Sequence, residues 1–259
     1  MRLANYHTHT ARCHHAIGED RYYVEDAIAS GKKVLGFSDH CPWVYRDGYL
    51  SETRMLPKDL DDYFSSILSL KREYARDITV YVGFESEYIP EQMEAQDKLL
   101  SDYPVDYMIL GQHFIVPENQ GSYMGFEPET EADFIRYIDL IIEGMESGRY
   151  RYVAHPDLCP FSKNPTLYET QYLRLCTYLQ AHDIPVEINL LGVVEKRHYT
   201  SPRFLSIAEK AGCSAIIGCD AHSPDRLNCR QGEAYCESMA AHYHLPLVDV
   251  LSGLEASIL

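Results

Sequence analysis

Short apolar runs alternate with amphipathic stretches along the whole chain, and this alternation restricts the folds that the chain can adopt. Seven of the runs are rich in Val, Ile and Tyr, as buried strands are. They lie at residues 3–6, 34–37, 78–84, 105–110, 152–154, 186–188 and 214–217. Between them, apolar residues recur at steps of three and four, which is typical of amphipathic helices. The pattern therefore predicts seven units, each a strand followed by a helix.

The predicted helices lie at residues 22–30, 57–76, 91–101, 131–147, 168–182, 202–211 and 230–242. Strands separated by helices pair in parallel through right-handed crossovers. No linker or repeat divides the 259 residues, and this length suits one α/β barrel. We therefore expect a single domain over residues 1–259, folded as a closed or nearly closed TIM-like barrel. An open doubly wound sheet is the alternative, although no GxGxxG motif follows the first predicted strand.

The charge balance narrows the range of binding partners. The chain has 23 Lys and Arg residues against 39 Asp and Glu residues, a formal charge of −16. This excess argues against binding to nucleic acid, which needs a basic surface. It does not exclude an anionic substrate, because bound metal ions can reverse the local field. No apolar run reaches the roughly 18 residues of a membrane helix, so no membrane partner is expected.

Cysteine usage and the start of the chain indicate the compartment. The first ten residues contain no apolar segment of a secretory signal, so we expect a cytoplasmic protein. The eight cysteines form no CxxC pair and are expected to be reduced thiols. Only Cys13 lies in a His-rich loop where it could touch a metal. The sequence leaves the oligomeric state open, including association of identical chains.

Residues of the types that bind metals follow nearly all of the predicted strands. In chain order they are His7, His9, Cys13, His14 and His15; Asp39 and His40; Glu85 and Glu87; Gln112 and His113; His155 and Asp157; Glu187 and Asn189; Asp220 and His222. In parallel α/β barrels the carboxyl ends of the strands meet at one mouth, where the active site is built. Side chains far apart in the sequence are therefore expected to gather there.

Spacing within these groups favours metal binding. His7 and His9 are two residues apart and point to the same side of an extended chain, and Asp220 and His222 repeat this geometry. Imidazole with carboxylate suits Zn, Mn or Fe. Seven histidines and two carboxylates exceed the needs of one tetrahedral ion, so we expect two or three divalent ions. Asp39 and Asp157 are expected to orient histidines rather than to bind the ions.

Such a cluster suits phosphoester hydrolysis. Two adjacent divalent ions can hold a hydroxide that attacks phosphorus, and they neutralise the charge on the phosphoryl oxygens. A phosphate site usually recruits Arg or Lys as well. Arg197 is the preferred clamp, and Lys163 and His198 are further candidates; a solvated charge pair of Lys196 and Arg197 is the alternative. Asp220 or His222 is expected to pass a proton to the leaving oxygen, and the sequence does not decide between them.

Taken together, these motifs resemble the polymerase and histidinol phosphatase (PHP) family, and within it the histidinol-phosphatase branch. The residues that carry the resemblance are His7-Thr8-His9, Cys13-x-His15, Ser38-Asp39-His40, Gly83-Phe84-Glu85, His113, His155, Glu187-Ile188-Asn189 and Gly218-Cys219-Asp220-Ala221-His222. The resemblance implies a distorted seven-stranded (β/α) barrel with a trinuclear metal centre and hydrolysis of L-histidinol phosphate in histidine biosynthesis. It implies as metal ligands His7, His9, His15, His40, Glu85, His113, His155, Asp220 and His222.

Three other functions stay open at this point. The same chemistry could act on another small phosphate ester. A zinc amidohydrolase also begins with HxH, but no lysine ends the fourth predicted strand here. A metal-binding scaffold without activity is the third. The sequence names no residue that recognises an imidazole or ammonium group, for which Glu87, Glu118 and Asp157 are candidates.

Overall fold

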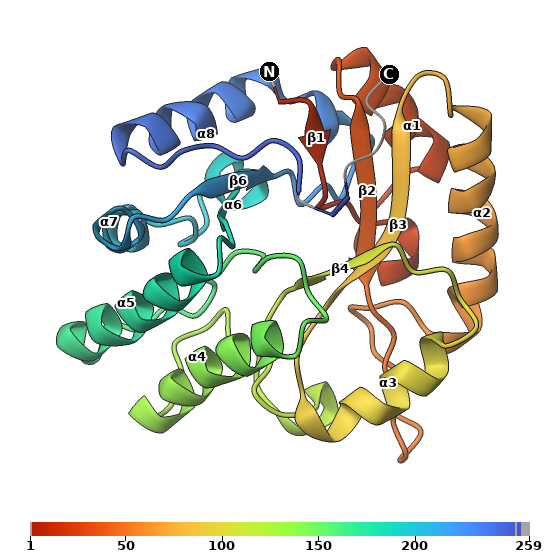
Figure 1. Ribbon diagram of the computed structural model, residues 1–259. Helices are drawn as coiled ribbons and strands as arrows, with labels where there is room; N and C mark the ends of the chain where they lie inside the picture. The colour runs from red at the N-terminus through yellow and green to blue at the C-terminus, as the bar shows by residue number, and fades with distance from the viewer. Residues whose placement is uncertain (1, 252, 255–259) are drawn as a thin grey trace.

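Parallel strands form the centre of the computed structural model, which describes residues 2–251, 253 and 254. Across these residues, four strands pair in the order β1-β2-β3-β4 and two more pair as β5-β6. The strands are β1 Ala4–Asn5, β2 Val34–His40, β3 Thr79–Ser86, β4 Tyr107–Leu110, β5 Val186–Asn189 and β6 Ala215–Gly218. Each lies within or overlaps a predicted run. The result is an α/β fold whose four-stranded parallel sheet is curled (Figure 1).

Isolated parallel bridges join the two sheets. Val153 pairs with Leu110 of β4 and with Val186 of β5, and Thr8 pairs with Ala221 just after β6. The predicted strand at 152–154 is thus a single bridging residue instead of a strand. The pairing does not continue, because His155, two positions after Val153, leaves the extended conformation at φ 29°.

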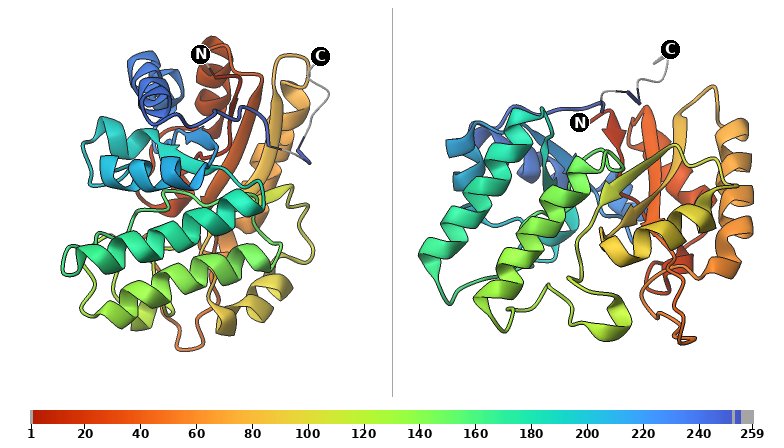
Figure 2. Two further views of the ribbon diagram at one scale, coloured as in Figure 1. Left: turned by 60° about the vertical axis from the view of Figure 1, so that its left-hand side comes forward. Right: turned by 60° about the horizontal axis from the view of Figure 1, so that its bottom comes forward.

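Helices surround the strands, as Figures 1 and 2 show. They are α1 Asp20–Ala29, α2 Leu60–Glu73, α3 Met93–Leu100, α4 Glu131–Glu146, α5 Pro165–Ala181, α6 Leu190–Val194, α7 Pro202–Ala211 and α8 Arg230–His242. In α2 the buried residues Leu60, Phe64 and Ile67 recur at helical spacing and face the sheet, as the sequence predicted. Short 3-10 turns precede several helices, including Pro57–Asp59 before α2.

Alternate residues of the strands face two different apolar clusters. In β4, Met108 and Leu110 belong to a large cluster shared with the helices. Tyr107 and Ile109 belong to a smaller cluster formed largely by strand residues. This period of two means that the smaller cluster fills the inside of the curled sheet. This cluster packs beneath the carboxyl ends of the strands. The predicted metal-binding residues gather at those ends.

Tyrosines contribute much of this inner packing. The Tyr107 hydroxyl donates to the backbone oxygen of Tyr6 across the inside of the sheet, at 2.7 Å. Gly36 and Gly83 leave room for Tyr107, since a Cβ at either position would overlap it. The interior below the site is therefore filled by large side chains rather than by solvent.

The state of the cysteines and the length of the helices can be compared with the predictions from the sequence. All eight cysteines are free thiols in the structure, and all but Cys229 are buried. This agrees with the expected absence of disulfide bonds. Among the described residues, the helices are too short or too polar to span a lipid bilayer.

Candidate metal centre

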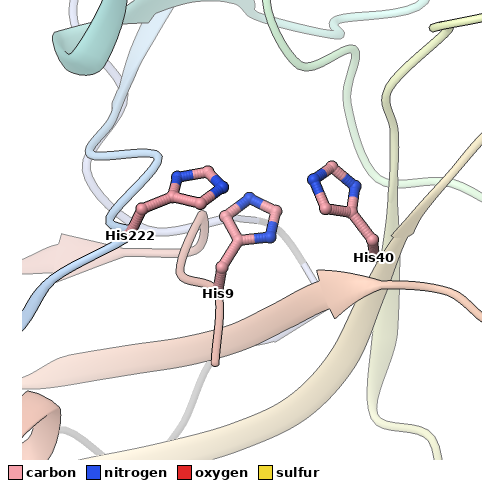
Figure 3. A group of neighbouring side chains, drawn as sticks. All are labelled: His9, His40 and His222. Carbon is pink, nitrogen blue, oxygen red and sulfur yellow. The ribbon is translucent and has the colours of Figure 1, made fainter. Parts of the chain in front are cut away.

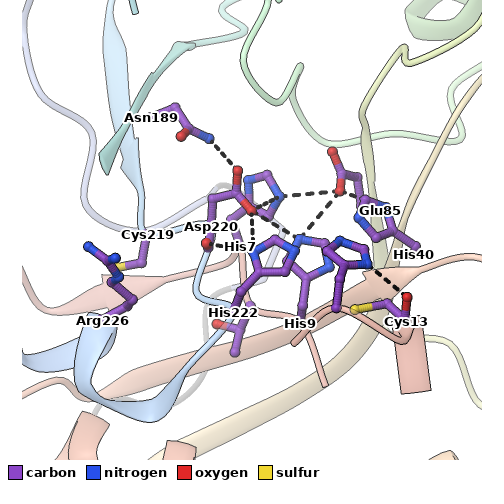
Figure 4. Close-up of polar contacts among 12 residues, drawn as sticks. His7, His9, Cys13, His40, Glu85, Asn189, Cys219, Asp220, His222 and Arg226 are labelled. Carbon is purple, nitrogen blue, oxygen red and sulfur yellow. Dashed lines mark hydrogen bonds and ion pairs between the residues drawn. The ribbon is translucent and has the colours of Figure 1, made fainter. Parts of the chain in front are cut away.

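All nine predicted metal ligands lie together at the carboxyl ends of the strands or just beyond them. His7 and His9 follow β1, His40 ends β2, Glu85 lies near the end of β3, and His113 follows β4. The remaining four are His15 after a 3-10 turn, His155 after the Val153 bridge, and Asp220 and His222 after β6. Figure 4 shows several of them converging from separate strands. The parallel topology places them there because every strand ends at the same rim.

Glu85 is one centre of this arrangement. Its Oε2 lies 3.4 Å from Nε2 of His7 and 3.2 Å from Nδ1 of His40. Its Oε1 lies 2.8 Å from Nε2 of His155 and 3.5 Å from Nε2 of His113. One buried carboxylate thus faces imidazoles from four separate segments of the chain. Gly111 makes this position possible, because a Cβ there would overlap the Glu85 side chain.

Asp220 is the second centre. Its Oδ1 lies 3.1 Å from Nε2 of His9, 3.5 Å from Nε2 of His7 and 3.3 Å from Nδ1 of His222. Asp220 has a positive φ of 49°, a backbone conformation that Asp tolerates better than most residues. Two carboxylates therefore lie among seven imidazoles.

A group of histidines borders Asp220. The rings of His9 and His222 stack with centroids 4.1 Å apart, and those of His9 and His40 are 4.3 Å apart (Figure 3). The ring of His15 lies 4.6 Å from that of His222. Ligand atoms of His9, His40 and His222 all lie within 4.8 Å of one another, and the same holds for His7, His9 and Asp220. Such groups are close enough to share an ion.

The donor atoms fit divalent cations. Buried atoms without a hydrogen-bond partner include Nε2 of His7, Nε2 of His9, Nε2 of His222 and both carboxylate oxygens of Glu85. An unsatisfied buried polar atom costs about 1–3 kcal/mol, and more when it is charged. A cation bound among these atoms would satisfy several of them together. Nitrogen and oxygen donors of this kind suit Zn, Mn or Fe.

The electrostatics favour the metal-binding protonation state of some of these residues and oppose it at others. Burial works to raise the pKa of Glu85, yet the surrounding imidazoles hold it well below its usual range, so the carboxylate is ionised. Burial lowers the pKa of His15 to about 4 and that of His40 well below its usual value, which leaves neutral rings. Burial opposes protonation of His7, but the carboxylates around it raise its pKa. A bound cation would compete with that proton.

A second layer of acidic side chains orients the histidines. Oε1 of Glu187 lies 2.9 Å from Nδ1 of His7, and Oε1 of Glu87 lies 3.0 Å from Nδ1 of His113. A carboxylate at Nδ1 fixes the proton there and turns Nε2 toward the centre. Oδ1 of Asp39 lies 3.5 Å from Nδ1 of His9 without a hydrogen bond between them, so its orienting role stays a prediction.

These roles of Glu187 and Glu87 were not predicted from the sequence. Both acids come at the end of a predicted strand or shortly after it, which is the signal that could have found them. Asp157, which was expected to orient a histidine, instead accepts a hydrogen bond from the backbone N–H of Ser201 at 2.7 Å. Its role is therefore to hold the segment that follows Arg197.

A cavity of about 660 Å³ opens over the centre. One end is formed by Glu85, Asp220 and five of the seven histidines, namely His15, His40, His113, His155 and His222. The remaining wall includes Tyr49, Arg54, Glu118, Tyr123, Leu191, Glu195, Arg197 and Tyr199. The Arg197 guanidinium donates to Oε2 of Glu195 and, at 2.9 Å, to the hydroxyl of Tyr199. Arg197, the phosphate clamp predicted from the sequence, lines the cavity.

Lys163 and His198 lie elsewhere. The Lys163 ammonium donates to the backbone oxygens of Pro128 and Glu129, at 2.7 and 2.8 Å. Nε2 of His198 lies 2.6 Å from the backbone oxygen of Leu158. Neither residue belongs to the cavity wall among the described residues. Their predicted contact with substrate gains no support, because the loops that carry them turn these side chains toward other loops.

This fold and this arrangement of histidines and carboxylates define a member of the PHP domain family. The family model matches residues 5–190, so the chain belongs to this family. Asp220 and His222 lie beyond the matched range.

Two curated proteins are similar to this chain over most of their length. The chain is 26% identical over 251 residues to the "Probable histidinol-phosphatase" of Deinococcus radiodurans, covering 91% of this chain and 92% of that protein. It is 25% identical over 261 residues to the "Probable histidinol-phosphatase" of Schizosaccharomyces pombe, covering 89% and 85%.

Solved structures share the fold. The histidinol phosphate phosphatase of Lactococcus lactis, complexed with Zn, L-histidinol and phosphate, superposes with a TM-score of 0.70 at 16% identity and covers 98% of each chain. Metal-dependent tyrosine phosphatases of Bacillus subtilis and Streptococcus pneumoniae give a TM-score of 0.52 at 16% identity, covering 91% of this chain and 86% of the matched chain.

Proposed function

We propose that the protein is a metal-dependent phosphomonoesterase that hydrolyses L-histidinol phosphate to L-histidinol and phosphate, as a step of histidine biosynthesis. The observation that carries this proposal is the convergence of seven histidines and two carboxylates in one cluster, of which five histidines and both carboxylates line an open cavity. The names of the two curated relatives, each matched over most of its length, support the choice of substrate.

The nine clustered residues are the proposed metal ligands: His7, His9, His15, His40, Glu85, His113, His155, Asp220 and His222. Two or three divalent ions, drawn from Zn, Fe and Mn, suit this number of donors, and we favour three. When bound, such ions supply Lewis-acid stabilisation of a phosphoryl group and a hydrolytic nucleophile near neutral pH. The Zn named with the Lactococcus lactis structure supports the metal class.

The chain's own residues bind and orient the ester. Arg197 faces the cavity, and its planar guanidinium matches two phosphoryl oxygens. In the structure Glu195 holds this group, so the substrate phosphate would take over contacts that Glu195 now makes. The pair Asp220 and His222 is the proposed source of a proton for the leaving alkoxide, because the two side chains are 3.3 Å apart at the cavity floor.

We extend the proposal to the architecture: a single domain over residues 1–259 with seven units closed into a distorted barrel. The bridges through Val153 and from Thr8 to Ala221 support closure, since they link β4 to β5 and the end of β1 to the end of β6. Cytoplasmic location and association of identical chains stay predictions.

A substrate panel tests the function. Phosphate release is measured from histidinol phosphate, tyrosine phosphate, sugar phosphates and nucleotides, with Zn, Mn or Fe supplied and the bound metal quantified. We expect histidinol phosphate to be the best substrate by kcat/KM. Equal rates on all esters would overturn the substrate assignment but keep the reaction. Metal binding without hydrolysis of any ester would favour a scaffold, and hydrolysis of an amide alone would favour an amidohydrolase.

A further inference from the structure

Arg54 is a buried cation held between two carboxylates at the wall of the cavity. Its side chain is 3% exposed. Nη2 donates to Oε1 of Glu87 at 2.9 Å, and Nη1 donates to Oε2 of Glu87 at 3.1 Å. Nε donates to Oε2 of Glu118 at 2.6 Å, and Nη1 also donates to the backbone oxygen of Cys41 at 3.2 Å. The guanidinium therefore joins three separate segments of the chain.

Glu87 connects Arg54 to the metal centre. Its Oε1 faces Nη2 of Arg54 and Nδ1 of His113, and its Oε2 accepts from Nη1 of Arg54 and from the indole N–H of Trp43. Each carboxylate oxygen thus has two partners, which leaves Glu87 one orientation. Because Nδ1 of His113 faces this carboxylate, its Nε2 is turned toward Glu85 and the centre, 3.5 Å away.

Glu118 connects Arg54 to the cavity wall. Besides Arg54, its carboxylate accepts hydrogen bonds from the hydroxyls of Tyr45 and Tyr49 at 3.1 Å and of Ser51 at 2.7 Å. These contacts fasten the segment 45–54 to the turn Glu118–Gln120. Tyr49 and Glu118 themselves line the cavity, so this fastening sets the shape of its outer wall.

We propose that Arg54 is a positioning residue that couples the cavity wall, through Glu118, to the orientation of the metal-facing His113, through Glu87. The proposal rests on the proposed function for the role of His113. A lysine cannot replace Arg54, because an ammonium is a point charge without the planar fork that grips Glu87 on both oxygens. Arg54 is therefore shared by two sets of contacts. We call the contact through Glu87 to His113 the His113 arm, and the contact through Glu118 to the cavity wall the wall arm.

Four variants separate the two arms. Arg54→Met and Arg54→Lys remove the fork, Glu87→Gln changes the His113 arm alone, and Glu118→Gln changes the wall arm alone. Arg149→Met is the matched control, because Arg149 forms a two-bond pair with Asp97 on another part of the surface. Each variant is measured for metal affinity by chelator competition, for KM and kcat with phosphate esters, and for unfolding of the metal-free protein. Nitrogen NMR of the metal-free protein reports which ring nitrogen of His113 carries the proton.

We expect Glu87→Gln to weaken metal binding roughly 10- to 100-fold, the usual effect of losing an orienting partner. Glu118→Gln should raise KM with metal affinity unchanged. Arg54→Met and Arg54→Lys should do both and should mix the two His113 tautomers, whereas Arg149→Met should change neither. The coupling is overturned if Arg54→Met leaves metal affinity, KM and the His113 tautomer as in the unaltered protein. It is also overturned if Glu118→Gln weakens metal binding as much as Glu87→Gln.

The proposed function fails in a different way. An unaltered protein that binds no divalent ion would overturn the metal role of His113 and with it the proposal. A protein that binds metal and hydrolyses esters, but whose Arg54 variants match the Arg149→Met control, would overturn the coupling alone. Variants that unfold are identified by the unfolding measurement, and the conservative Arg54→Lys then carries the test.

Discussion

The carboxylate of Glu187 lies 2.9 Å from Nδ1 of His7, although the two residues are 180 positions apart in the sequence. Both side chains are fully buried. The same carboxylate accepts the backbone N–H of His155 at 2.7 Å and the side-chain amide of Asn189 at 2.9 Å. One acid from β5 therefore orients a histidine that follows β1 and anchors the loop that carries another.

Replacement of this acid tests its orienting role. Glu187→Gln keeps one acceptor oxygen and replaces the other with an NH₂ group. That NH₂ group then faces a hydrogen-bond donor, so one pair of contacts is lost. We expect metal affinity or turnover to fall about 10- to 100-fold with the fold retained. Chelator competition and phosphate release measure this. Glu209→Gln is the control, because Glu209 pairs with His244 in the same way at an exposed position. An equal effect of the two variants would contradict the orienting role.

Removal of a proposed ligand should abolish the reaction. His9→Ala or Asp220→Ala deletes a buried side chain that faces two or more others of the cluster. We expect phosphate release to be lost and the circular dichroism spectrum to be kept, since the apolar clusters below the site are untouched. Near-normal turnover in either variant would show that the altered residue is no ligand.

Metal removal should also destabilise the protein. Ions that bind only the folded chain add RT ln(1 + [L]/Kd), about 2.7 kcal/mol for one site at a hundredfold excess over Kd. We therefore expect a chelator to lower the free energy of unfolding by at least about this amount, and Zn, Mn or Fe to restore it. Denaturant titration with and without chelator measures the change. Unfolding that ignores the chelator would argue against a bound ion.

The position of the site could be predicted from the sequence because two local patterns coincide there: the alternation of strands and helices, and the metal-binding residue types directly after strands. Alternating strand and helix patterns predict a parallel sheet, and parallel strands end at one rim. A side chain directly after a strand, such as His7 or His113, is then located without any knowledge of the loops. The structure puts both at the rim.

Contacts that depend on loop direction could not be predicted in this way. Lys163 lies eight positions after His155, and nothing in the local pattern shows that its ammonium turns toward Pro128 and Glu129. Arg54 had no assigned role, because its partners Glu87 and Glu118 are 33 and 64 positions away. The run at 152–154 has strand composition, yet only Val153 pairs, since the chain turns at His155.

Mutation separates Arg197 from Lys163, two of the three candidates for phosphate binding. Arg197→Met removes the cation at the cavity wall, and hydrogen bonds to charged groups contribute about 1.5–3 kcal/mol. We expect KM for the phosphate ester to rise roughly 10- to 100-fold, with metal content unchanged. Lys163→Met should leave KM unaltered, because its ammonium is bound to backbone oxygens outside the cavity. A reversed order of the two effects would reassign the clamp.

Buried tyrosines predict loss of stability in alkaline solution. Burial raises the pKa of Tyr6 to about 12, whereas an unfolded tyrosine ionises near its ordinary value of about 10. Between these values the unfolded chain binds fewer protons than the folded chain, so the free energy of unfolding falls as pH rises. Below about pH 10 the tyrosine is protonated in both states, so its full contribution to the free energy of unfolding is present.

Burial likewise raises the pKa values of Tyr107 and Tyr152 in the same inner cluster. We therefore expect denaturant midpoints to fall from about pH 10 upward, with the tyrosinate absorbance of the buried tyrosines appearing only on unfolding. Tyr6→Phe should flatten this dependence, and Tyr22→Phe, at a half-exposed position, is the control. Gradual ionisation of all tyrosines in the folded protein near pH 10 would contradict the tight inner packing.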